Sequence, residues 1–501
     1  MPVDGKPNFT GVWRVVRGDN REFILIQQKE ADVAFVEFAQ GRPFTLKAAI
    51  NGQPQRQTLN GAPCEPLAKW DNDDLHFEVK PGAGGTHVRY ILRLAAGGET
   101  ASVYRTTFAI TPATFIEKWE RQDGPELQPA VNGFELLRAR VNPGPPKSLL
   151  EKHLETGKLG YAFNDIPLAE REFTTIIREE GNSTLKGDER SVYDHARELL
   201  TRLYLRNGMI KKASLYSTAL NRSFLGKFAK YPEAVVLHRG YARIPYTRDP
   251  GGHFILPVMA AGKSVDMLVD NGAFNTLIRA SEARRLGLKL RSLTWGTRTY
   301  VKESMPMQLA IVPRLKVGAT TLRDVPFWVV PDEQLERPGV LGLNILLKLE
   351  TIRFAQDGFA ETGFASEDID YEKANLSFDE DSFMLTEVST NGQPPAPFVL
   401  DLGAENTLLF ARFSMRFFDL ISANSKLGAT SLTAMGADRT FGSVRLQEVT
   451  LRLFCNELVD GQVIVFLEKT IMQYEGTIAI DVINKAQRVT MDLRAMRLVL
   501  E

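Results

Sequence analysis

The sequence MLVDNGAFNTLI at residues 267–278 returns almost unchanged as FVLDLGAENTLL at residues 398–409. In both copies an apolar run leads into an aspartate, followed by any residue, Gly-Ala, any residue and Asn-Thr-Leu. The apolar run predicts a buried strand, and the glycine lets the backbone turn sharply after it. An internal repeat of this kind predicts two similar units. We therefore expect a pseudo-two-fold axis to bring Asp270 and Asp401 face to face.

The bulk composition is that of an ordinary globular protein without a charge bias. The chain has 501 residues, enough for several domains with sizeable buried cores. Hydrophobic residues make up 44% of it and charged residues 24%. Lys plus Arg equal Asp plus Glu at 61 each, so the charge predicts no nucleic-acid partner and no anionic membrane surface. No run approaches the ~18 apolar residues of a transmembrane helix, so we expect no transmembrane segment.

The first residues and the two cysteines bear on localisation. The opening MPVDGKPN lacks the apolar core of a signal peptide, so we expect a soluble, untargeted chain. The alternative is an exported, periplasmic protein whose leader has been removed. Cys64 and Cys455 lie far apart in the sequence, which favours two free buried thiols over a disulfide and leaves the redox compartment open.

Residues 1–141 are predicted to form a β module. Apolar and polar positions alternate in short runs separated by Gly- and Pro-containing turns, and strands at this spacing predict a closed barrel or a sandwich. The run Asn8–Trp13 is similar to the Gly-x-Trp segment that begins the first strand of lipocalin-type barrels. Two readings stay open: a barrel packed with its own side chains and a barrel that holds a ligand. The runs lie at 11–15, 23–26, 33–38, 87–92, 101–106 and 114–119.

Residues 147–235 are predicted to be helical. The preceding NPGPP at 142–146 reads as a stiff linker. Beyond it the apolar period becomes that of a helix, because Ala196, Leu199 and Leu203 fall on one face. Two helical hairpins are expected, and their rhythm resembles a degenerate tetratricopeptide pair. The segment is either a spacer packed on its neighbours or a docking site for a protein partner.

From residue 236 to the end the pattern is β again, in two matching series at 236–370 and 371–501. Each series has an apolar strand before its aspartate, a short helix, a glycine-containing hairpin, further strands and a closing apolar segment. The aspartates are 131 residues apart, since 401 − 270 = 131. The predicted fold class is therefore a multidomain, mainly β protein. It has an N-terminal β-barrel, an α-helical hairpin domain and a bilobal C-terminal half.

The repeated aspartate carries the predicted chemistry. An isolated Asp-x-Gly is more often a turn or a cap, but recurrence in the same context favours a functional pair. Two carboxylates within a few Å cannot both ionise readily, so they share a proton and titrate as a unit. One then acts as the base to a bound water while the other donates to the scissile carbonyl oxygen.

Rival constellations of residues do not fit. Six histidines supply neither a His-Glu-x-x-His nor paired Cys/His spacing, so we expect no metal site. The chain has no Gly-x-Ser-x-Gly elbow. Gly262-Lys-Ser264 is similar to the end of a phosphate loop, but Pro257 stands where that loop needs its first glycine. We expect no cofactor.

Taken together, these motifs resemble a retropepsin-like aspartic protease, in a single-chain, two-lobed form that covers about 236–501. The resemblance rests on the LVDNGA and VLGLN segments and the helix-forming ARRLGL between them. It implies an endopeptidase that acts on a peptide or protein, with Asp270 and Asp401 as the catalytic dyad. It further implies two active-site turns, at Gly272-Ala273 and Gly403-Ala404, and two flap hairpins, near Gly296 with Tyr300 and near Gly436.

Three positions depart from the family pattern. Active members have Thr or Ser directly after each aspartate, whose hydroxyl braces the dyad across the lobe interface; here the residues are Asn271 and Leu402. Asparagine can still form a polar brace, whereas leucine has no side-chain donor or acceptor. Ala479 replaces the glycine expected in the second closing segment. The alternative function is therefore a catalytically impaired, peptide-binding or scaffold protein.

Overall fold

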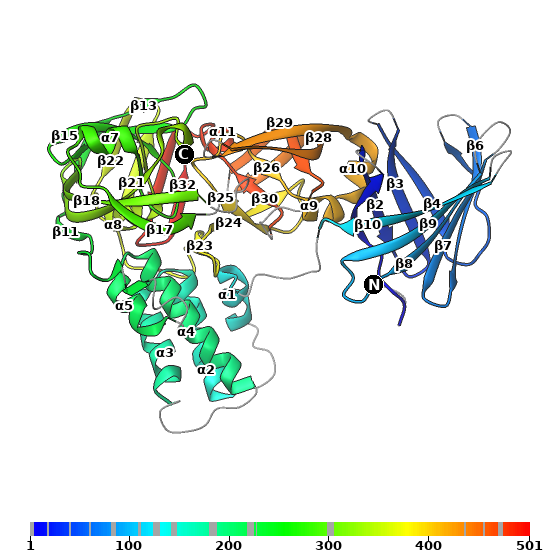
Figure 1. Ribbon diagram of the computed structural model, residues 1–501, viewed down its shortest axis with the longest axis horizontal. Coiled ribbons are helices and arrows are strands. Elements are labelled where there is room, and N and C mark those ends of the chain that lie inside the picture. The colour runs from blue at the N-terminus through cyan, green and yellow to red at the C-terminus, as the bar shows by residue number, and fades with distance from the viewer. Residues whose placement is uncertain are drawn as a thin grey trace.

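A computed structural model gives the arrangement of the chain (Figure 1). Strand is the most common secondary structure in the described chain, in barrel-like sheets, which confirms the prediction of a mainly β protein. No described helix combines the length and the apolarity needed to cross a membrane. Tyr300, Gly436, Cys455 and the predicted linker at 142–146, all named above, lie outside the described part. The structure describes residues 5–17, 20–39, 42–59, 62–81, 87–108, 112–123, 131–141, 148–179, 188–217, 225–226, 228–297, 305–434, 437–453, 456–468 and 474–501.

The N-terminal part is a ten-stranded antiparallel meander with the order β4-β3-β2-β1-β10-β9-β8-β7-β6-β5. Its two edges approach each other where Ile50 bridges Ala68. The interior holds both aliphatic and aromatic side chains, and the rings of Phe35 and Phe77 stack with centroids 4.2 Å apart. Likeness to lipocalins stays a prediction. The strands are β1 (Gly11–Arg17), β2 (Asn20–Gln28), β3 (Asp32–Ala39), β4 (Arg42–Ala49), β5 (Gln57–Leu59), β6 (Ala62–Asp71), β7 (Asp74–Pro81), β8 (His87–Leu94), β9 (Thr100–Phe108) and β10 (Ala113–Arg121).

Helix α1 (Gly133–Val141) lies inside the range 1–141 that the sequence assigned to the β module, so that assignment is wrong for these residues. The barrel's last strand, β10, already ends at Arg121. The helix begins because the side chain of Asn132 accepts hydrogen bonds from the backbone N–H groups of Phe134 and Glu135, at 3.2 and 3.3 Å. It packs against the other helices, so close to Phe163 that a Cβ on Gly133 would lie 3.0 Å from that ring.

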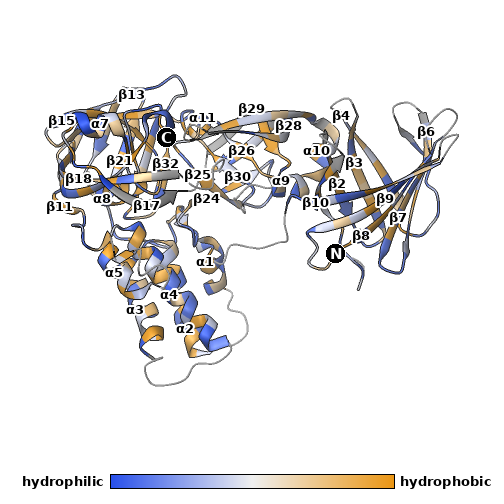
Figure 2. Cartoon of the chain, in the orientation of Figure 1, coloured by the Kyte–Doolittle hydropathy of each residue, from blue (hydrophilic) through white to orange (hydrophobic). Residues whose placement is uncertain are grey.

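The next helices form the expected helical part, with α2 packed on α3 and α4 on α5. Figure 2 shows hydrophobic and hydrophilic residues alternating along these helices, as amphipathic packing requires. Helices α2 and α3 approach closely at Gly160, where a Cβ would lie 2.6 Å from the backbone nitrogen of Ala169. Likeness to tetratricopeptide repeats stays a prediction. The helices are α2 (Leu149–Ala162), α3 (Ile166–Glu179), α4 (Asp188–Arg206) and α5 (Ile210–Tyr216).

A nine-stranded sheet carries Asp270 and is called the Asp270 sheet below. Its main path is β11-β19-β16-β20-β15-β14-β18-β17, with β13 paired to β14. Helices α7 (Ala280–Arg285) and α8 (Leu343–Leu349) belong to the same segment of chain. The strands are β11 (Val235–His238), β13 (Thr247–Arg248), β14 (Phe254–Ala260), β15 (Lys263–Val269), β16 (Leu277–Arg279), β17 (Arg291–Thr297), β18 (Met305–Val317), β19 (Thr320–Val330) and β20 (Gly339–Leu341).

An eight-stranded sheet carries Asp401 and is called the Asp401 sheet. Its order is β23-β24-β25-β30-β26-β29-β28-β27, and its pairings match those of the Asp270 sheet. In each sheet the strand before the aspartate pairs in parallel with a closing strand, β15 with β20 and β25 with β30. Helices α9 (Ala411–Arg416), α10 (Phe418–Asn424) and α11 (Ile480–Ile483) complete it. The strands are β23 (Ser377–Phe378), β24 (Met384–Thr390), β25 (Ala396–Leu400), β26 (Leu408–Leu409), β27 (Lys426–Ala434), β28 (Ala437–Leu453), β29 (Asn456–Phe466) and β30 (Gly476–Ile478).

A third sheet joins the two series, because it draws strands from both sides of the division predicted at 370/371. Its order is β12-β22-β21-β31-β32, and β21 pairs with β31 from Thr351↔Asp492 to Ala355↔Arg488. The ranges 236–370 and 371–501 therefore share this third sheet, in addition to the sheet that each carries of its own. The strands are β12 (Ala242–Pro245), β21 (Thr351–Ala355), β22 (Phe359–Thr362), β31 (Arg488–Asp492) and β32 (Arg497–Leu500).

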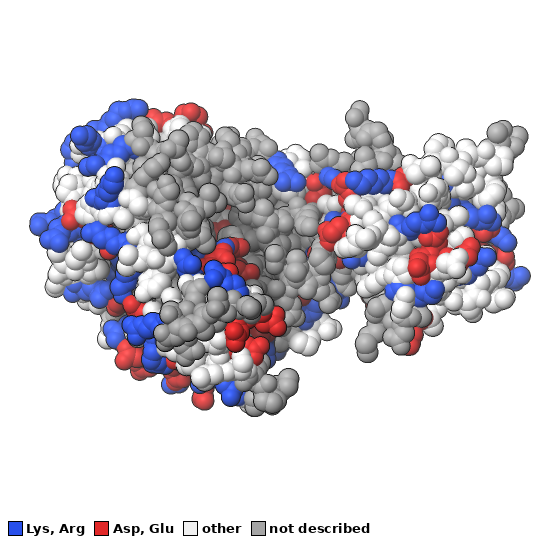
Figure 3. Space-filling view, turned by 60° about the horizontal axis from the view of Figure 1, so that its bottom comes forward, with Lys and Arg blue, Asp and Glu red and all other residues white. Residues whose placement is uncertain are grey.

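The barrel lies at one end of the molecule, beside the Asp401 sheet, and the helices lie below the Asp270 sheet (Figure 1). Phe23 of the barrel presses on β28 so closely that a Cβ on Gly442 would lie 2.1 Å from its ring. On the face shown in Figure 3, basic and acidic residues are interspersed over the barrel, in keeping with the equal totals of the two signs.

Candidate active site

The two repeated aspartates meet between the sheets. Asp270 directly follows β15, and Asp401 directly follows β25. A Cβ placed on Gly272 would lie 2.4 Å from Oδ1 of Asp401, and one placed on Gly403 would lie 2.2 Å from Cγ of Asp270. Each carboxyl group therefore lies directly against the glycine of the opposite turn. Only glycine fits at these two positions, which explains why both copies of the repeat contain it.

Each carboxyl group is also held by its own turn. Oδ1 of Asp270 accepts hydrogen bonds from the backbone N–H groups of Gly272 and Ala273, at 2.8 and 3.0 Å. Oδ1 of Asp401 accepts one from the N–H of Gly403 at 2.9 Å. Asp401 is buried and Asp270 is partly exposed. The pair is thus fixed by short backbone bonds while one member remains accessible.

Burial raises the pKa of both carboxyl groups, and the nearby Asp401 adds to the rise at Asp270. For Asp270 the main cause is burial, followed by the negative charge of Asp401, and backbone N–H groups oppose these effects. For Asp401 burial again raises the pKa, against the N–H groups of Gly403 and Ala404 and a hydrogen bond with Asp270. Two such groups share a proton because ionising both would place two negative charges side by side.

Asn271 braces the pair across the interface between the two sheets. Its side-chain oxygen accepts a hydrogen bond from the N–H of Leu402 at 2.8 Å, and its side-chain nitrogen donates to the carbonyl oxygen of Leu400 at 2.7 Å. The Asn271 side chain is buried, so neither backbone group has to be left unpaired. Leu402 is fully buried among apolar residues and makes no reciprocal side-chain bond. The brace is therefore one-sided.

Two further pairs of side chains stabilise the turns that follow Asp270 and Asp401, and sequence analysis did not predict them. Thr276 donates to Oδ1 of Asn344 through its N–H at 3.0 Å and its hydroxyl at 2.8 Å. In the other copy Thr407 donates in the same two ways to the carboxylate of Asp481, at 2.9 and 2.8 Å. The sequence did contain a signal for this contact. The threonine belongs to the Asn-Thr-Leu shared by both copies, and its partner lies two places after Gly342 in one copy and after Ala479 in the other.

The closing segments differ by one methyl group. A Cβ on Gly342 would lie 2.5 Å from the backbone of Asn275, so this position requires glycine. Ala479 stands at the matching position, fully buried, and its N–H donates to the hydroxyl of Thr407 at 3.1 Å. The equivalent bond in the first copy runs from the N–H of Gly342 to the hydroxyl of Thr276, also at 3.1 Å. Alanine therefore preserves the bond that glycine makes.

The predicted flap residues are placed only in part. Gly296 lies on β17, where it pairs with Pro306 of β18. Strands β27 and β28 form the matching hairpin, with Ala434 paired to Ala437. Tyr300 and Gly436 lie outside the described residues.

His253 is a further neighbour of the site for which the sequence offered no signal. Its ring Nδ1 lies 3.0 Å from Oδ1 of Asp249, and Asp249 also pairs with Arg337 at 2.6 Å. A positive charge on His253 lowers the pKa of Asp401, although by less than the backbone N–H groups do. A lone histidine in a sequence carries no such information, because its distant neighbours are set by the fold.

Comparison with known proteins gives one family for part of the chain. Residues 256–345 match the family model described as aspartyl protease. The match supports an aspartic protease domain in this part of the chain, and the matched stretch includes Asp270 but not Asp401. This result confirms the part of the predicted resemblance that concerns the first repeat.

Two solved structures are similar to parts of the chain. A retropepsin-like aspartic protease from Rickettsia conorii shares 20% identity, covering 26% of this chain and 92% of that one with a TM-score of 0.21. An abundant heat soluble (SAHS) protein from Ramazzottius varieornatus shares 10% identity, covering 23% of this chain and 95% of that one with a TM-score of 0.19. No curated protein matches the sequence.

Proposed function

We propose that the protein is an aspartic endopeptidase in which the Asp270 and Asp401 sheets form the two lobes of a peptide-binding cleft. The observation that carries this proposal is the crossed packing of the two carboxyl groups on Gly403 and Gly272. Such an arrangement keeps the carboxyl groups close enough to share one proton, and the raised pKa of each favours that state.

In the proposed reaction the dyad activates a water molecule bound between Asp270 and Asp401. The ionised carboxylate takes a proton from the water as its oxygen attacks the scissile carbonyl carbon, and the protonated carboxyl group donates its proton to the carbonyl oxygen. The carbon–nitrogen bond of the tetrahedral intermediate then breaks as the nitrogen receives a proton from the dyad. The reaction needs neither a metal nor a covalent intermediate.

The surrounding parts fit these roles. The Asn271 brace supports the dyad from one side, in the place where relatives of the resembled family carry a hydroxyl. We propose that the β17–β18 and β27–β28 hairpins, with Gly296, Tyr300 and Gly436, cover an extended peptide bound over the dyad.

The test is cleavage of a mixed peptide library between about pH 3 and pH 8, the range over which carboxyl groups with raised pKa titrate. Wild-type protein is compared with Asp270→Asn and Asp401→Asn, and both variants should lose cleavage. Asp266→Asn is the matched control, because Asp266 is an exposed aspartate on the same strand, β15. Cleavage that persists in both dyad variants would rule out the dyad. Absence of cleavage by every form would favour a non-catalytic, peptide-binding protein.

A further inference from the structure

One face of the Asp270 sheet carries a continuous row of apolar side chains that leads up to Asp270. Successive residues of a strand point to opposite faces, so Leu268 lies on the same face as Asp270. Directly paired residues on neighbouring strands share a face, and the pairings extend this row across five strands. The apolar row consists of Leu268, Val340, Leu277, Trp328 and Leu309 on β15, β20, β16, β19 and β18.

The other face of the same sheet is the interior of the domain. The residues that alternate with the apolar row belong to the main hydrophobic core: Val269, Leu341, Ile278, Val329 and Ala310. The apolar row instead belongs to a separate cluster that includes Ala273, whose N–H binds Asp270. The row therefore lies on the face that a peptide bound at Asp270 would contact.

This face is already occupied by residues from another part of the chain. Phe228 lies on Trp328, with ring centroids 5.4 Å apart at 44°, and only 4% of Phe228 is exposed. Tyr231 belongs to the same cluster, and the guanidinium of Arg291, which pairs with Leu309, lies 4.7 Å from its ring. With these side chains in place, the row residue Leu309 is 2% exposed.

The occupying segment is a tight turn. The N–H of Tyr231 donates to the carbonyl oxygen of Phe228 at 2.8 Å, and that of Ala229 donates to Leu225 at the same distance. Residues 228–231, called the 228–231 turn below, therefore offer side chains to the row without extending their backbone across the dyad. A folded turn of this kind blocks a subsite without presenting its own peptide bonds in the extended form that the proposed reaction needs.

The matching row of the Asp401 sheet is different. Its pairings run from Val399 through Thr477, Leu408 and Ile464 to Arg445. Arg445 is exposed, whereas its counterpart Leu309 is covered. The occupied apolar face is thus a feature of the Asp270 side.

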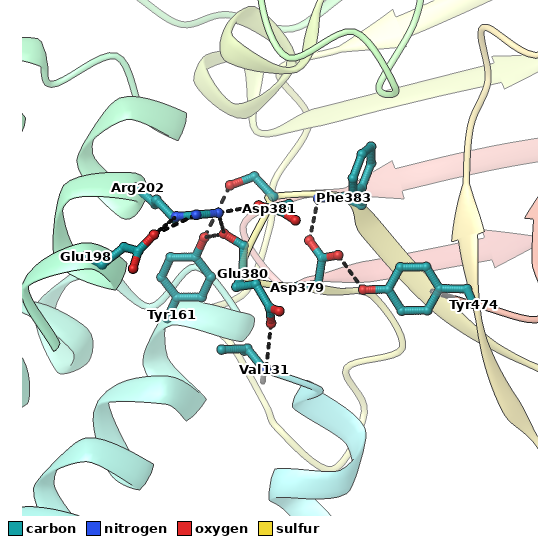
Figure 4. Close-up of polar contacts among 10 residues, drawn as sticks. Val131, Tyr161, Glu198, Arg202, Asp379, Glu380, Asp381, Phe383 and Tyr474 are labelled. Atoms are coloured by element: carbon teal, nitrogen blue, oxygen red, sulfur yellow. Dashed lines mark hydrogen bonds and ion pairs between the residues drawn. The ribbon is translucent and has the colours of Figure 1, made fainter. Parts of the chain in front are cut away.

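The helices that precede the turn are fixed to both sheets. Figure 4 shows Tyr161 and Arg202 reaching the loop at 379–383, where each donates to the carbonyl oxygen of Glu380 at 2.9 Å. On the other side, Nζ of Lys348 in α8 donates to the carbonyl oxygen of Asn207 at 3.2 Å. The helices that precede the 228–231 turn are therefore anchored on both halves of the repeat.

We propose that Phe228 and Tyr231 occupy, within the chain itself, the subsite that receives an apolar side chain of the peptide next to the scissile bond. The substrate class is then peptides with an aromatic or large aliphatic residue at that place, and such a peptide binds only by displacing the 228–231 turn. This inference rests on the proposed function, because it assumes that a peptide binds at the dyad.

Binding is measured separately from catalysis, on the Asp270→Asn variant. The probes are two fluorescently labelled peptides that differ only in Phe or Ala at one position, followed by anisotropy with and without Phe228→Ala. We expect Phe228→Ala to tighten binding of the Phe peptide by about tenfold or more, because removing an internal competitor raises the competent fraction. The Ala peptide should change little. Leu215→Ala, an exposed residue on the neighbouring α5, is the control and should change neither.

Two further arms exclude a merely structural role for Phe228. Phe228→Leu keeps most of the apolar volume but loses the ring contact with Trp328. It should therefore also tighten binding of the Phe peptide, by a smaller factor than Phe228→Ala does. Unlabelled LGKFAKY, the sequence of 225–231, should compete with the Phe peptide on the Phe228→Ala variant. Weaker or unchanged binding of the Phe peptide in Phe228→Ala would overturn the inference.

The two proposals fail in different ways. Tighter binding without any cleavage by the intact dyad would sustain the occupied subsite and contradict the peptidase. Cleavage by wild-type protein with no effect of Phe228→Ala on binding would sustain the peptidase and contradict the occupied subsite.

Discussion

The carboxyl group of Asp270 lies against Gly403 so closely that a Cβ on this glycine would be 2.2 Å from Cγ of Asp270. The reciprocal contact joins Asp401 to Gly272. The two glycines thus set the spacing of the dyad, because any side chain at either position displaces the carboxyl group opposite.

Gly403→Ala should abolish peptide cleavage, because the new methyl group forces the Asp270 carboxyl out of its place. Overpacking of this kind costs about 1–3 kcal/mol, so most of the molecules should remain folded. Cleavage assays and denaturant unfolding measure the two effects. Gly428→Ala on β27, where a Cβ meets nothing within 4 Å, is the control for stability. Wild-type cleavage by Gly403→Ala would contradict the crossed geometry.

Asn271→Leu should destabilise the protein more than Asn271→Thr does. Leucine leaves the buried N–H of Leu402 and the carbonyl of Leu400 without their partner, at about 1–3 kcal/mol for each group. Threonine has one hydroxyl that can accept from the first and donate to the second. Chemical unfolding of the three proteins gives the comparison, and equal stabilities would show that the brace contributes nothing.

Asp481→Asn should be tolerated while Asp481→Leu is not. Asn344 already performs the same task in the first copy, accepting from the N–H and hydroxyl of Thr276. Leucine at 481 would leave both donors of the buried Thr407 unpaired, which costs about 1–3 kcal/mol per group. Thermal or denaturant unfolding distinguishes the two variants. If both lose the same stability, the charge of Asp481 matters rather than its oxygens.

Peptide cleavage should have its optimum at a higher pH than the pKa of an ordinary aspartate would predict. Burial raises the pKa of Asp270 and of Asp401 above the usual 3.8. A carboxyl group with a raised pKa keeps its proton to higher pH. The pair therefore loses its first proton, which creates the state with one shared proton, and then its second proton at higher pH than two ordinary aspartates would. Measuring kcat/KM against pH tests this, and an optimum below pH 3.8 would contradict it.

Asp379→Asn should remove part of the pH dependence of stability. Burial raises the pKa of Asp379 to about 7, against hydrogen bonds from Tyr474 and from the N–H of Phe383. Figure 4 shows both partners. Because the folded pKa exceeds the unfolded one, the folded state binds the proton more tightly, and its stability falls as pH rises from about 4 through about 7 by about 1.4 kcal/mol per pKa unit.

Unfolding free energies of wild-type protein and Asp379→Asn between about pH 4 and 8 isolate this contribution, since all other titrating groups are common to both. The wild-type curve should fall more steeply over this range. Parallel curves would place the pKa of Asp379 near its ordinary value.

Local patterns predicted much of the fold. The alternation of apolar residues marked the strands on both sides of each aspartate, and the period near Ala196 and Leu203 marked α4. Helix α1 was missed because its only strong signal is Asn132 as an N-cap, inside a stretch assigned to the barrel. The pairing of β21 with β31 was missed as well, since it joins residues 137 positions apart, such as Arg353 and Thr490 at 490 − 353.

The sequence by itself singled out Asp270 and Asp401, because Asp-x-Gly-Ala is a local signal that repetition makes specific. Only the tertiary structure decided what surrounds them. Asn271 bonds to the backbone of Leu400 and Leu402, at the end of the strand that leads to Asp401. Phe228 packs on Trp328, which lies 328 − 228 = 100 positions further along the chain. Those contacts depend on which faces meet after folding, and no local pattern records that.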